Sequence, residues 1–365
     1  MKIVTVVGAR PQFIKAALVS KRLQELPDIE EILVHTGQHY DDEMSDIFFR
    51  EMGIPLPKIN LGIGSGTHGE QTAHMLEGTE KVLMDEQPEI VMVYGDTNST
   101  LAGALAAAKL GIPVAHVEAG LRSFNRTMPE EINRIMADHL SSMLFAPTQQ
   151  SVSNLLAEGI RTDKIHEIGD VMYDAALYFG KQAEHRSSIL GELALKKGGY
   201  ILATVHRAEN TDDPSRLAVL MEAFRMLSLE LSVVVPLHPR TRDALAKTGL
   251  FMGQRQQIML IPPLGYLDML QLERYAKTIV TDSGGVQKEA FFFRVPCVTL
   301  REETEWVELV ESGWNRLAPP RSVEHILEIV RNAGAITLAE VDFYGGGRAV
   351  ERLAGVLQHS MTHRL

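Results

Sequence analysis

The sequence predicts an α/β protein made of two Rossmann-like domains, each with a doubly wound parallel sheet. Short runs rich in valine and isoleucine alternate with longer amphipathic stretches, which is typical of βα units. The alternation starts again at residue 200, after a polar and helix-prone stretch at 178–199. The chain has 365 residues, more than one hydrophobic core usually holds, so a second domain is expected.

The first half of the chain contains six expected strands, several of which end in a glycine, an alanine or a carboxylate. In a parallel sheet the carboxyl ends of the strands share one edge, and ligands bind there. Residues at strand ends are therefore the candidates for function. The strands are expected at 3–7, 32–36, 90–94, 114–118, 143–146 and 164–168, and the helices between them at 11–26, 67–85, 98–110 and 130–139.

A second set of short strands follows, and the tail from Gly347 is expected to be helical. The expected domains are 1–178 and 199–346, with a separate C-terminal helix at 347–365. Two successive open sheets predict a ligand-binding cleft between them. The strands of this second set are at 200–205, 232–236, 258–261, 278–281, 297–300 and 316–317.

Composition argues against several classes of protein. The net charge of −11 disfavours binding to nucleic acid or to an anionic membrane. No apolar run approaches the length of a membrane span, and the first strand follows Lys2 without a signal peptide. Cys297 lies in an apolar run and is the one cysteine, so we expect a buried structural thiol and no disulfide. A cytoplasmic protein is expected.

Two strand ends are suited to binding phosphate. Gly8-Ala9-Arg10-Pro11 closes the first strand and opens a helix, whose N-terminus offers backbone N–H groups. Arg10, and Lys15 one turn later, add positive charge, although solvated basic side chains are the alternative. In the second half, Asp282-Ser283-Gly284-Gly285 follows a strand, and its small residues let the backbone approach phosphate oxygens.

Glu289 lies about one turn inside the helix that follows this turn, where a carboxylate is expected to accept the ribose hydroxyls. The alternative for the turn is an ordinary helix cap formed by Asp282 or Ser283. The chain has no GxxxxGK[ST] loop, and no GxGxxG follows the first strand. Neither a P-loop NTPase nor a dinucleotide cofactor is therefore expected, and we expect no other cofactor.

Carboxylates end two neighbouring strand candidates of the first half: Asp96 follows 90–94, and Glu118 ends 114–118. Glu130, Glu131 and Arg134 lie at the start of the next helix. Carboxylates crowded together raise one another's pKa, which permits proton transfer near neutral pH. The alternatives are a helix cap for Asp96 and helix-dipole interactions for Glu130 and Glu131.

In the second half, His206 and Arg207 follow the strand at 200–205, with Asn210 close behind, and His238 follows the next strand. A histidine at such a position is a candidate acid, base or phosphate donor. A core histidine is the alternative at both positions. The remaining histidines show no metal-binding spacing, so no metal site is expected.

These segments, in order over nearly the whole chain, resemble the non-hydrolysing UDP-N-acetylglucosamine 2-epimerases. The resemblance implies a GT-B-like fold with the active site between the domains, a C-terminal helix that returns to the first domain, and a homodimer. The segments are Gly8-x-Arg10-Pro11-x-x-x-Lys15, Thr36-Gly37-Gln38-His39, Gly95-Asp96-Thr97, His116-Val117-Glu118-Ala119-Gly120-Leu121-Arg122, Pro129-Glu130-Glu131-x-Asn133-Arg134, His206-Arg207-x-Glu209-Asn210 and Asp282-Ser283-Gly284-Gly285-x-Gln287-x-Glu289.

The resemblance also implies roles for individual residues. The substrate is a UDP-linked amino sugar: a base removes the C2 proton while UDP leaves C1, and UDP adds back to the resulting 2-acetamidoglucal after protonation from the opposite face. Because the C2 proton is not acidic, the leaving group needs strong stabilisation. The catalytic residues are Asp96, Glu118, Glu131 and His206. The residues that hold the UDP-sugar are Arg10, Lys15, Arg134, His206, Arg207, Asn210, His238, Met269, Ser283, Gly284, Gly285 and Glu289.

Three segments depart from the family's pattern. The Gln-His-x-x-Met-Leu-x-Gln segment of relatives regulated by UDP-N-acetylglucosamine is not matched at 38–46, and Met269 stands where an aromatic residue often packs on uracil. The usual Thr-Glu-Arg-Pro-Glu is replaced by Glu303-Thr304-Glu305-Trp306-Val307-Glu308, followed by Gly313-Trp314-Asn315. With His238-Pro239-Arg240-Thr241, this departure resembles the branch that acts on UDP-2,3-diacetamido-2,3-dideoxyglucuronate in O-antigen pathways. In that branch Arg240 or Arg242 would pair with the sugar carboxylate, and solvated side chains are the alternative for both.

UDP-N-acetylglucosamine is the first expectation for the substrate, and the diacetamido uronate is the second. A GT-B glycosyltransferase with a UDP-sugar donor is the alternative of another class, but it has no need for Asp96, Glu118 and Glu131 together. A non-catalytic UDP-sugar sensor and a hydrolysing epimerase are the remaining alternatives.

Overall fold

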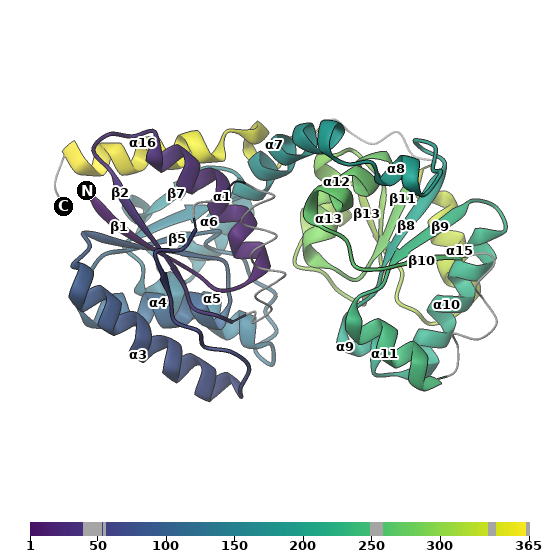
Figure 1. The fold of residues 1–365 in the computed structure, drawn as a ribbon, viewed down its shortest axis with the longest axis horizontal. Helices are drawn as coiled ribbons and strands as arrows, with labels where there is room; N and C mark the ends of the chain where they lie inside the picture. The colour runs from purple at the N-terminus through teal and green to yellow at the C-terminus, as the bar shows by residue number, and fades with distance from the viewer. Residues whose placement is uncertain (39–52, 54–55, 249–257, 335–340, 363–365) are drawn as a thin grey trace. The chain divides into compact units, whose positions relative to one another are not determined.

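The computed structural model describes residues 1–38, 53, 56–248, 258–334 and 341–362, and its chain divides into two compact units (Figure 1). The first unit comprises Met1–Ala175 and Asp342–Leu365, and the second comprises Ala176–Val341. The segment 39–46, in which the sequence lacks the family's regulatory pattern, lies outside the described residues. None of the described helices is both long enough and apolar enough to cross a membrane.

The first unit contains a seven-stranded parallel sheet in the order β3-β2-β1-β4-β5-β6-β7. Its strands are β1 (Lys2–Val7), β2 (Glu30–His35), β3 (Ile59–Asn60), β4 (Ile90–Tyr94), β5 (Val114–Val117), β6 (Met143–Ala146) and β7 (Ile165–Glu167). The helices are α1 (Arg10–Gln24), α3 (His68–Glu86), α4 (Asn98–Lys109), α5 (Pro129–Leu140), α6 (Gln149–Ala157), the start of α7 (Val171–Arg186) and α16 (Ala349–Thr362), with short 3₁₀ turns at Thr162–Lys164 and Gly345–Gly347.

Helices cover both faces of this sheet: α1 and α16 lie on one side and α3 and α4 on the other (Figure 1). The central strands are therefore buried on both faces, which explains their continuous apolar runs. Helix α4 packs very closely, because a Cβ on Gly103 would lie 3.1 Å from Val93 and 3.3 Å from Val6. The C-terminal helix is tied to this unit by the Arg22–Glu351 ion pair and by Asp174, which accepts hydrogen bonds from the first backbone N–H groups of α16.

The second unit repeats the plan with a six-stranded parallel sheet in the order β10-β9-β8-β11-β12-β13. Its strands are β8 (Tyr200–Thr204), β9 (Ser232–Pro236), β10 (Ile258–Ile261), β11 (Thr278–Thr281), β12 (Cys297–Thr299) and β13 (Asn315–Leu317). Its helices are α8 (Ile189–Glu192), α9 (Ala208–Thr211), α10 (Pro214–Ser228), α11 (Pro239–Thr248), α12 (Tyr266–Tyr275), α13 (Gly284–Phe292), α14 (Val307–Glu311) and α15 (Val323–Asn332). Two core clusters fill the two faces, one against α10 and α15 and the other against α8, α12 and α13.

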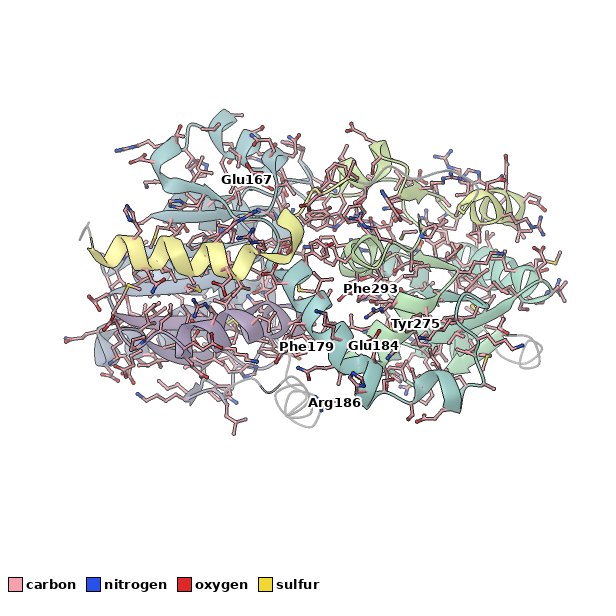
Figure 2. All side chains as sticks on the ribbon, turned by 90° about the horizontal axis from the view of Figure 1, so that it is seen from above. Glu167, Phe179, Glu184, Arg186, Tyr275 and Phe293 are labelled. Atoms are coloured by element: carbon pink, nitrogen blue, oxygen red, sulfur yellow. The ribbon has the colours of Figure 1, made fainter. Side chains whose placement is uncertain are left out.

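The stretch at 178–199 is largely helical, formed by the end of α7 and by α8. Phe179 packs edge-to-face on Tyr266, and the Tyr275 hydroxyl donates to Glu184 at 3.1 Å (Figure 2). This end of α7 is therefore part of the second unit, whereas Asp174 at its start contacts α16 of the first.

The two parallel sheets confirm the predicted fold class. In each sheet the strand order reverses between two central strands, β1 and β4 in the first unit and β8 and β11 in the second. Doubly wound sheets bind ligands at the carboxyl ends of such strands. The segments that begin at Gly8, Gly95, Val205 and Asp282 lie at these positions.

Candidate active site

Two adjacent strands of the first unit end next to candidate catalytic residues. β4 and β5 pair in parallel with Tyr94 opposite Val117, so Asp96 and Glu118 follow them at the same edge of the sheet. Thr97 caps α4, because its hydroxyl accepts a hydrogen bond from the Thr100 N–H at 3.3 Å. Asp96 is therefore not the helix cap, which was its alternative role.

Glu118 forms an ion pair with Lys15, which lies on α1 one turn after Arg10. Both side chains of the pair are about nine-tenths buried. Glu118 also has a φ of 71°, which is uncommon for a residue with a side chain. Residues held in such conformations concentrate at functional sites, so the geometry supports Glu118 as a site residue.

Arg134 connects the other two candidate carboxylates. It donates to the Asp96 carboxylate through Nη2, and its Nη1 lies 3.2 Å from a Glu131 oxygen. Asn133, from the same helix, donates to the Asp96 backbone carbonyl at 3.0 Å. Helix α5 thus supplies one of the carboxylates and two of the residues that hold Asp96.

The three carboxylates differ in accessibility. The Asp96 side chain is 31% exposed, whereas that of Glu131 is 1% exposed. Glu131 accepts hydrogen bonds from the Ser123 N–H at 2.9 Å, the Ser123 hydroxyl at 3.0 Å and the Phe124 N–H at 2.9 Å. It therefore holds the loop before α5, a role that goes beyond the helix-dipole alternative.

In the second unit, Asp282 anchors the loop that follows the neighbouring strand. Its buried carboxylate accepts hydrogen bonds from the backbone N–H groups of His206 and Arg207 and from the Asn210 side chain, all at 3.0 to 3.1 Å. Arg207 Nε donates back to the Asp282 carbonyl at 3.0 Å. The structure thus brings together the two second-unit segments that the sequence singled out.

His206 is partly accessible, with 37% of its side chain exposed. Its Nδ1 lies 3.2 Å from Asp282, and its ring centre lies 5.5 Å from that of His238. Burial lowers the pKa of His206 below its usual value of 6.5, although the Asp282 carboxylate opposes this. The ring is therefore mostly neutral at neutral pH, and it is not the core histidine of the alternative interpretation.

The Ser283–Gly285 turn begins α13. Ser283 occupies the N-cap position but makes no side-chain cap hydrogen bond, and Asp282 points to the other loop. Neither side chain caps the helix, so the ordinary-cap alternative does not hold here. Glu289, one turn further on, is buried and accepts a hydrogen bond from the Tyr266 hydroxyl at 3.0 Å.

The segment that departs from the family's pattern packs on this turn. Trp306 Nε1 donates to the Gly284 carbonyl at 3.0 Å, and a Cβ on Gly284 would overlap a Glu305 carboxylate oxygen. Glu305 pairs with Arg301 at 2.9 Å. Burial opposes ionisation of Glu305, but Arg301, a backbone hydrogen bond and Arg207 together outweigh it and lower the pKa of Glu305.

Three further candidate residues each have neighbours of their own within the second unit. Met269 is partly buried and packs in the apolar cluster between α8, α12 and α13. Arg240 pairs with Asp212 at 2.6 Å, and Arg242 pairs with Asp243 at 3.1 Å. Both arginines offered for a sugar carboxylate therefore already have acidic partners. A surface pocket lined by Glu184 and Tyr275 contains none of the candidate residues.

The sequence assigned no structural role to several residues that shape these sites. Asn133 and Tyr266 hold Asp96 and Glu289, and Glu305 and Trp306 cover the Gly284 turn. Asp138 was not among the predicted site residues, although it pairs with His116 and Arg122. Its position on α5, seven residues after Glu131, was the available signal, because two turns of helix bring both residues to the same face.

Comparisons with known proteins identify the family. A profile of the family described as UDP-N-acetylglucosamine 2-epimerase matches residues 21–358. The chain is 51% identical over 361 residues to a Pseudomonas aeruginosa UDP-2,3-diacetamido-2,3-dideoxy-D-glucuronate 2-epimerase, which covers 98% of this chain and 99% of that protein. It is 52% identical over 362 residues to a Methanococcus maripaludis UDP-N-acetylglucosamine 2-epimerase homolog, with 98% of this chain and 100% of that one covered.

A crystal structure of the Methanocaldococcus jannaschii UDP-GlcNAc 2-epimerase in complex with UDP-GlcNAc and UDP is also similar. It matches with a TM-score of 0.90 and 44% identity over 98% of this chain and 100% of that chain. This similarity confirms the GT-B-like fold. By sequence profile, by identity over nearly its full length and by structure, the chain belongs to the UDP-N-acetylglucosamine 2-epimerase family.

Proposed function

We propose that this chain inverts C2 of a UDP-linked 2-acetamido sugar by eliminating and re-adding UDP. The observation that carries the proposal is the group of carboxylates at the edge of the first sheet, Asp96, Glu118 and Glu131, held by Lys15 and Arg134. Membership of the 2-epimerase family supports it.

The proposed reaction has two halves. In the first, a carboxylate takes the C2 proton while the C1–O bond breaks, and UDP leaves with the bonding electrons to give a 2-acetamidoglucal. In the second, a proton is delivered to C2 from the opposite face and UDP re-forms the C1–O bond. Both halves move a proton and no hydride, so the route needs no redox cofactor.

Asp96 and Glu118 are the proposed proton carriers. Asp96 is the most accessible of the three carboxylates, and Glu118 is next. A cation beside a carboxylate lowers its basicity. A substrate diphosphate that attracts Lys15 would weaken the Lys15–Glu118 ion pair. Glu118 would then be a stronger base than it is in the unbound protein. Glu131, which is buried and accepts three hydrogen bonds, is proposed to hold the Ser123–Phe124 loop and Arg134 in place.

The second unit is proposed to bind UDP. The N-terminus of α13 presents backbone N–H groups at Gly284 and Gly285, and anions are stabilised at such helix ends. His206 and Arg207 lie on the adjacent loop and would stabilise the charge that develops on the leaving diphosphate. Glu289 is placed one turn inside the helix to accept ribose hydroxyls. The proposal requires these groups and the carboxylates of the first unit to act on one substrate molecule.

UDP-N-acetylglucosamine is the first candidate substrate, since a relative with a TM-score of 0.90 was crystallised with it. The second candidate is UDP-2,3-diacetamido-2,3-dideoxy-D-glucuronate. One observation keeps it as a candidate: identity to the Pseudomonas aeruginosa enzyme that is named for this sugar is 51%, against 52% for the Methanococcus maripaludis homolog and 44% for the Methanocaldococcus jannaschii enzyme. The acidic partners of Arg240 and Arg242 disfavour these two arginines as ligands of its carboxylate.

The test is to incubate each UDP-sugar with the protein in D₂O and to follow C2 by NMR. We expect deuterium at C2 of the epimerised product, because the proton taken from C2 exchanges with solvent. Epimerised product without solvent deuterium would contradict the mechanism. Transfer of the sugar to an acceptor would indicate the glycosyltransferase, release of free N-acetylmannosamine and UDP the hydrolysing enzyme, and binding without turnover the sensor. The rates for the two sugars decide the substrate.

We also propose that the chain forms a homodimer, as its resemblance to the family implies. Light scattering at several protein concentrations tests this, and a constant monomer mass would contradict it. The cytoplasmic location stays a prediction.

A further inference from the structure

A buried ion network lies next to the strand ends that carry Asp96 and Glu118, and the proposed reaction gives it no role. It consists of His116 on β5, Asp138 on α5, Arg122 in the loop after β5, and Glu158 just after α6. The His116 and Asp138 side chains are fully buried. Burying charged groups is costly unless they are paired, so the partners of each group in the network indicate its charge.

Both ring nitrogens of His116 lie beside hydrogen-bond acceptors. Nε2 is 2.7 Å from the Gly95 carbonyl oxygen, and Nδ1 is 2.7 Å from an Asp138 carboxylate oxygen. A carbonyl oxygen has no proton to give, so Nε2 carries a hydrogen. The other Asp138 oxygen accepts the Gly120 N–H at 3.1 Å and pairs with the Arg122 guanidinium at 2.7 Å, an environment that favours the carboxylate. Nδ1 of His116 is therefore placed to donate a hydrogen to a carboxylate oxygen.

With a hydrogen on each nitrogen, His116 would be an imidazolium ion. The charges around it alternate, because Asp138 also pairs with Arg122 at 2.7 Å and Arg122 pairs with Glu158 at 2.7 Å. His139 lies 3.4 Å from Glu158 at the outer end of the network. On the other side, the Lys15 ammonium lies 3.2 Å from the position that a Cβ on Gly95 would occupy.

This network connects the three elements that carry the catalytic carboxylates. His116 holds the carbonyl of Gly95, which precedes Asp96, and Asp138 accepts the Gly120 N–H at 3.1 Å, two residues after Glu118. Asp138 itself lies on α5, the helix of Glu131. Glu118 has a φ of 71°, which is uncommon for a residue with a side chain, so the loop after β5 adopts a conformation that needs support from its surroundings.

We propose that His116 and Asp138 are positioning residues of the epimerase, with His116 held as a buried imidazolium that fixes Asp96 and Glu118 relative to Glu131. The inference rests on the proposed function for its catalytic consequence, but the charge of His116 can be tested without turnover. Reactions that depend on several groups lose about 100-fold in rate when one of them moves by about an ångström.

The first experiment observes the His116 ring directly. The whole protein is labelled with ¹⁵N-histidine, and the ring signals of His116 are identified by their loss in His116→Gln. We expect N–H protons on both ring nitrogens at about pH 8, where a solvent-exposed histidine is neutral. A His116 ring with one unprotonated nitrogen at that pH would overturn the proposal, whether or not the protein epimerises any sugar.

The second experiment measures kcat, KM and the Kd for UDP in Asp138→Asn, His116→Gln and His116→Ala. We expect kcat to fall by about 10- to 100-fold in Asp138→Asn, with the Kd for UDP changed less than about threefold. His116→Gln keeps one donor and should retain more activity than His116→Ala. His166→Gln is the matched control, because His166 lies on β7 of the same sheet outside the network, and its kinetics should not change.

Folded Asp138→Asn and His116→Gln variants with unchanged kcat would overturn the positioning role. An equal loss of kcat and of UDP affinity would do so too, because it indicates general damage to the fold. Should these variants fail to fold, the ring spectrum of the unaltered protein still decides the charge of His116. If neither UDP-sugar is epimerised by the unaltered protein, the proposed function fails, and a neutral His116 is then a separate failure.

Discussion

Both units pair a fully buried aspartate with a histidine Nδ1, but they take the two residues from different elements. Asp138 on α5 is 2.7 Å from His116 on β5, whereas Asp282, after β11, is 3.2 Å from His206, after β8. Each aspartate also accepts backbone N–H groups of a neighbouring strand-end loop. The pair therefore serves in both units to hold loops of adjacent strands together.

The difference lies in the other ring nitrogen. His116 has no exposed surface and donates from Nε2 to the Gly95 carbonyl, whereas the His206 side chain is 37% exposed. Burial lowers the pKa of His206, and the proposal gives its ring a direct role with UDP. We call the His116–Asp138 pair closed, because neither side chain is exposed, and the His206–Asp282 pair open, because the His206 side chain is partly exposed and can contact a ligand. Accessibility, and not residue type, distinguishes them.

The comparison predicts that changes to the carboxylates of the first unit affect proton transfer and not UDP binding. Asp96→Asn and Glu118→Gln should each lower kcat by about 10² to 10⁴-fold, because a carboxamide cannot take the C2 proton. Glu131→Gln should also lower kcat, through the loop that it holds. Steady-state kinetics and the Kd for UDP test this. Glu167→Gln is the control, since Glu167 is an exposed carboxylate at the end of β7 in the same sheet (Figure 2).

Loss of UDP binding in Asp96→Asn, with kcat preserved, would show that the assignment of the first unit to proton transfer is wrong. Preserved kcat in both variants would remove the proposed mechanism altogether.

Changes in the second unit should instead affect UDP binding. Gly284→Ala places a Cβ against the Glu305 carboxylate, so either the turn or Glu305 must move. We expect the Kd for UDP to rise by about 10-fold, which corresponds to roughly 1.4 kcal/mol. Calorimetric titration with UDP measures it. Gly334→Ala is the control, because a Cβ there meets no atom within 4 Å. An unchanged Kd in Gly284→Ala would place the diphosphate elsewhere.

The open pair should also show its titration in the pH profile. As the pH falls through the lowered pKa of His206, its ring gains a proton and a positive charge, which stabilises the leaving diphosphate more strongly than the neutral ring does. We expect kcat/KM to rise as the pH falls below 6.5, by about 10-fold at most, and this limb to be missing in His206→Gln. His325→Gln, in α15 of the same unit, should keep the limb. A limb that persists in His206→Gln belongs to another group.

The sequence predicted the strands within one or two residues because parallel strands covered on both faces are continuous apolar runs. It predicted Asp96, Glu118, His206 and Ser283 as site candidates because each follows a strand at the edge where ligands bind. It missed β3, since two residues give no periodicity. It also missed the partners of these residues: Lys15 and Glu118 are far apart in sequence, and their pairing depends on the register of β1, β4 and β5. Whether a histidine is closed or open likewise depends on packing, which sequence does not show.

The smallest expected effect tests why Asp138 is charged. Glu31, in the same unit, has an enclosed carboxyl group that accepts the Thr5 hydroxyl at 2.6 Å and the Ser20 hydroxyl at 3.0 Å, and none of these partners is charged. Burial raises the pKa of Glu31 above its usual 4.5, and the hydroxyls only partly oppose this, whereas the cations beside Asp138 lower the pKa of that carboxyl. A buried carboxyl group thus ionises readily in this unit when cations surround it.

Because the folded-state pKa of Glu31 is raised, the folded protein holds this proton to higher pH than the unfolded chain does. The contribution of Glu31 to stability is therefore fully present below pH 4.5 and is lost as the pH rises through the folded-state pKa. Glu31→Gln does not titrate, so its melting temperature relative to the unaltered protein should rise by about 2 to 4 °C between pH 4.5 and pH 8. Glu77→Gln should shift the opposite way or not at all, because Lys81 lowers the pKa of Glu77. A pH-independent difference for Glu31→Gln would mean that enclosure alone does not set the charge of this carboxyl, and the contrast with Asp138 would lose its physical basis.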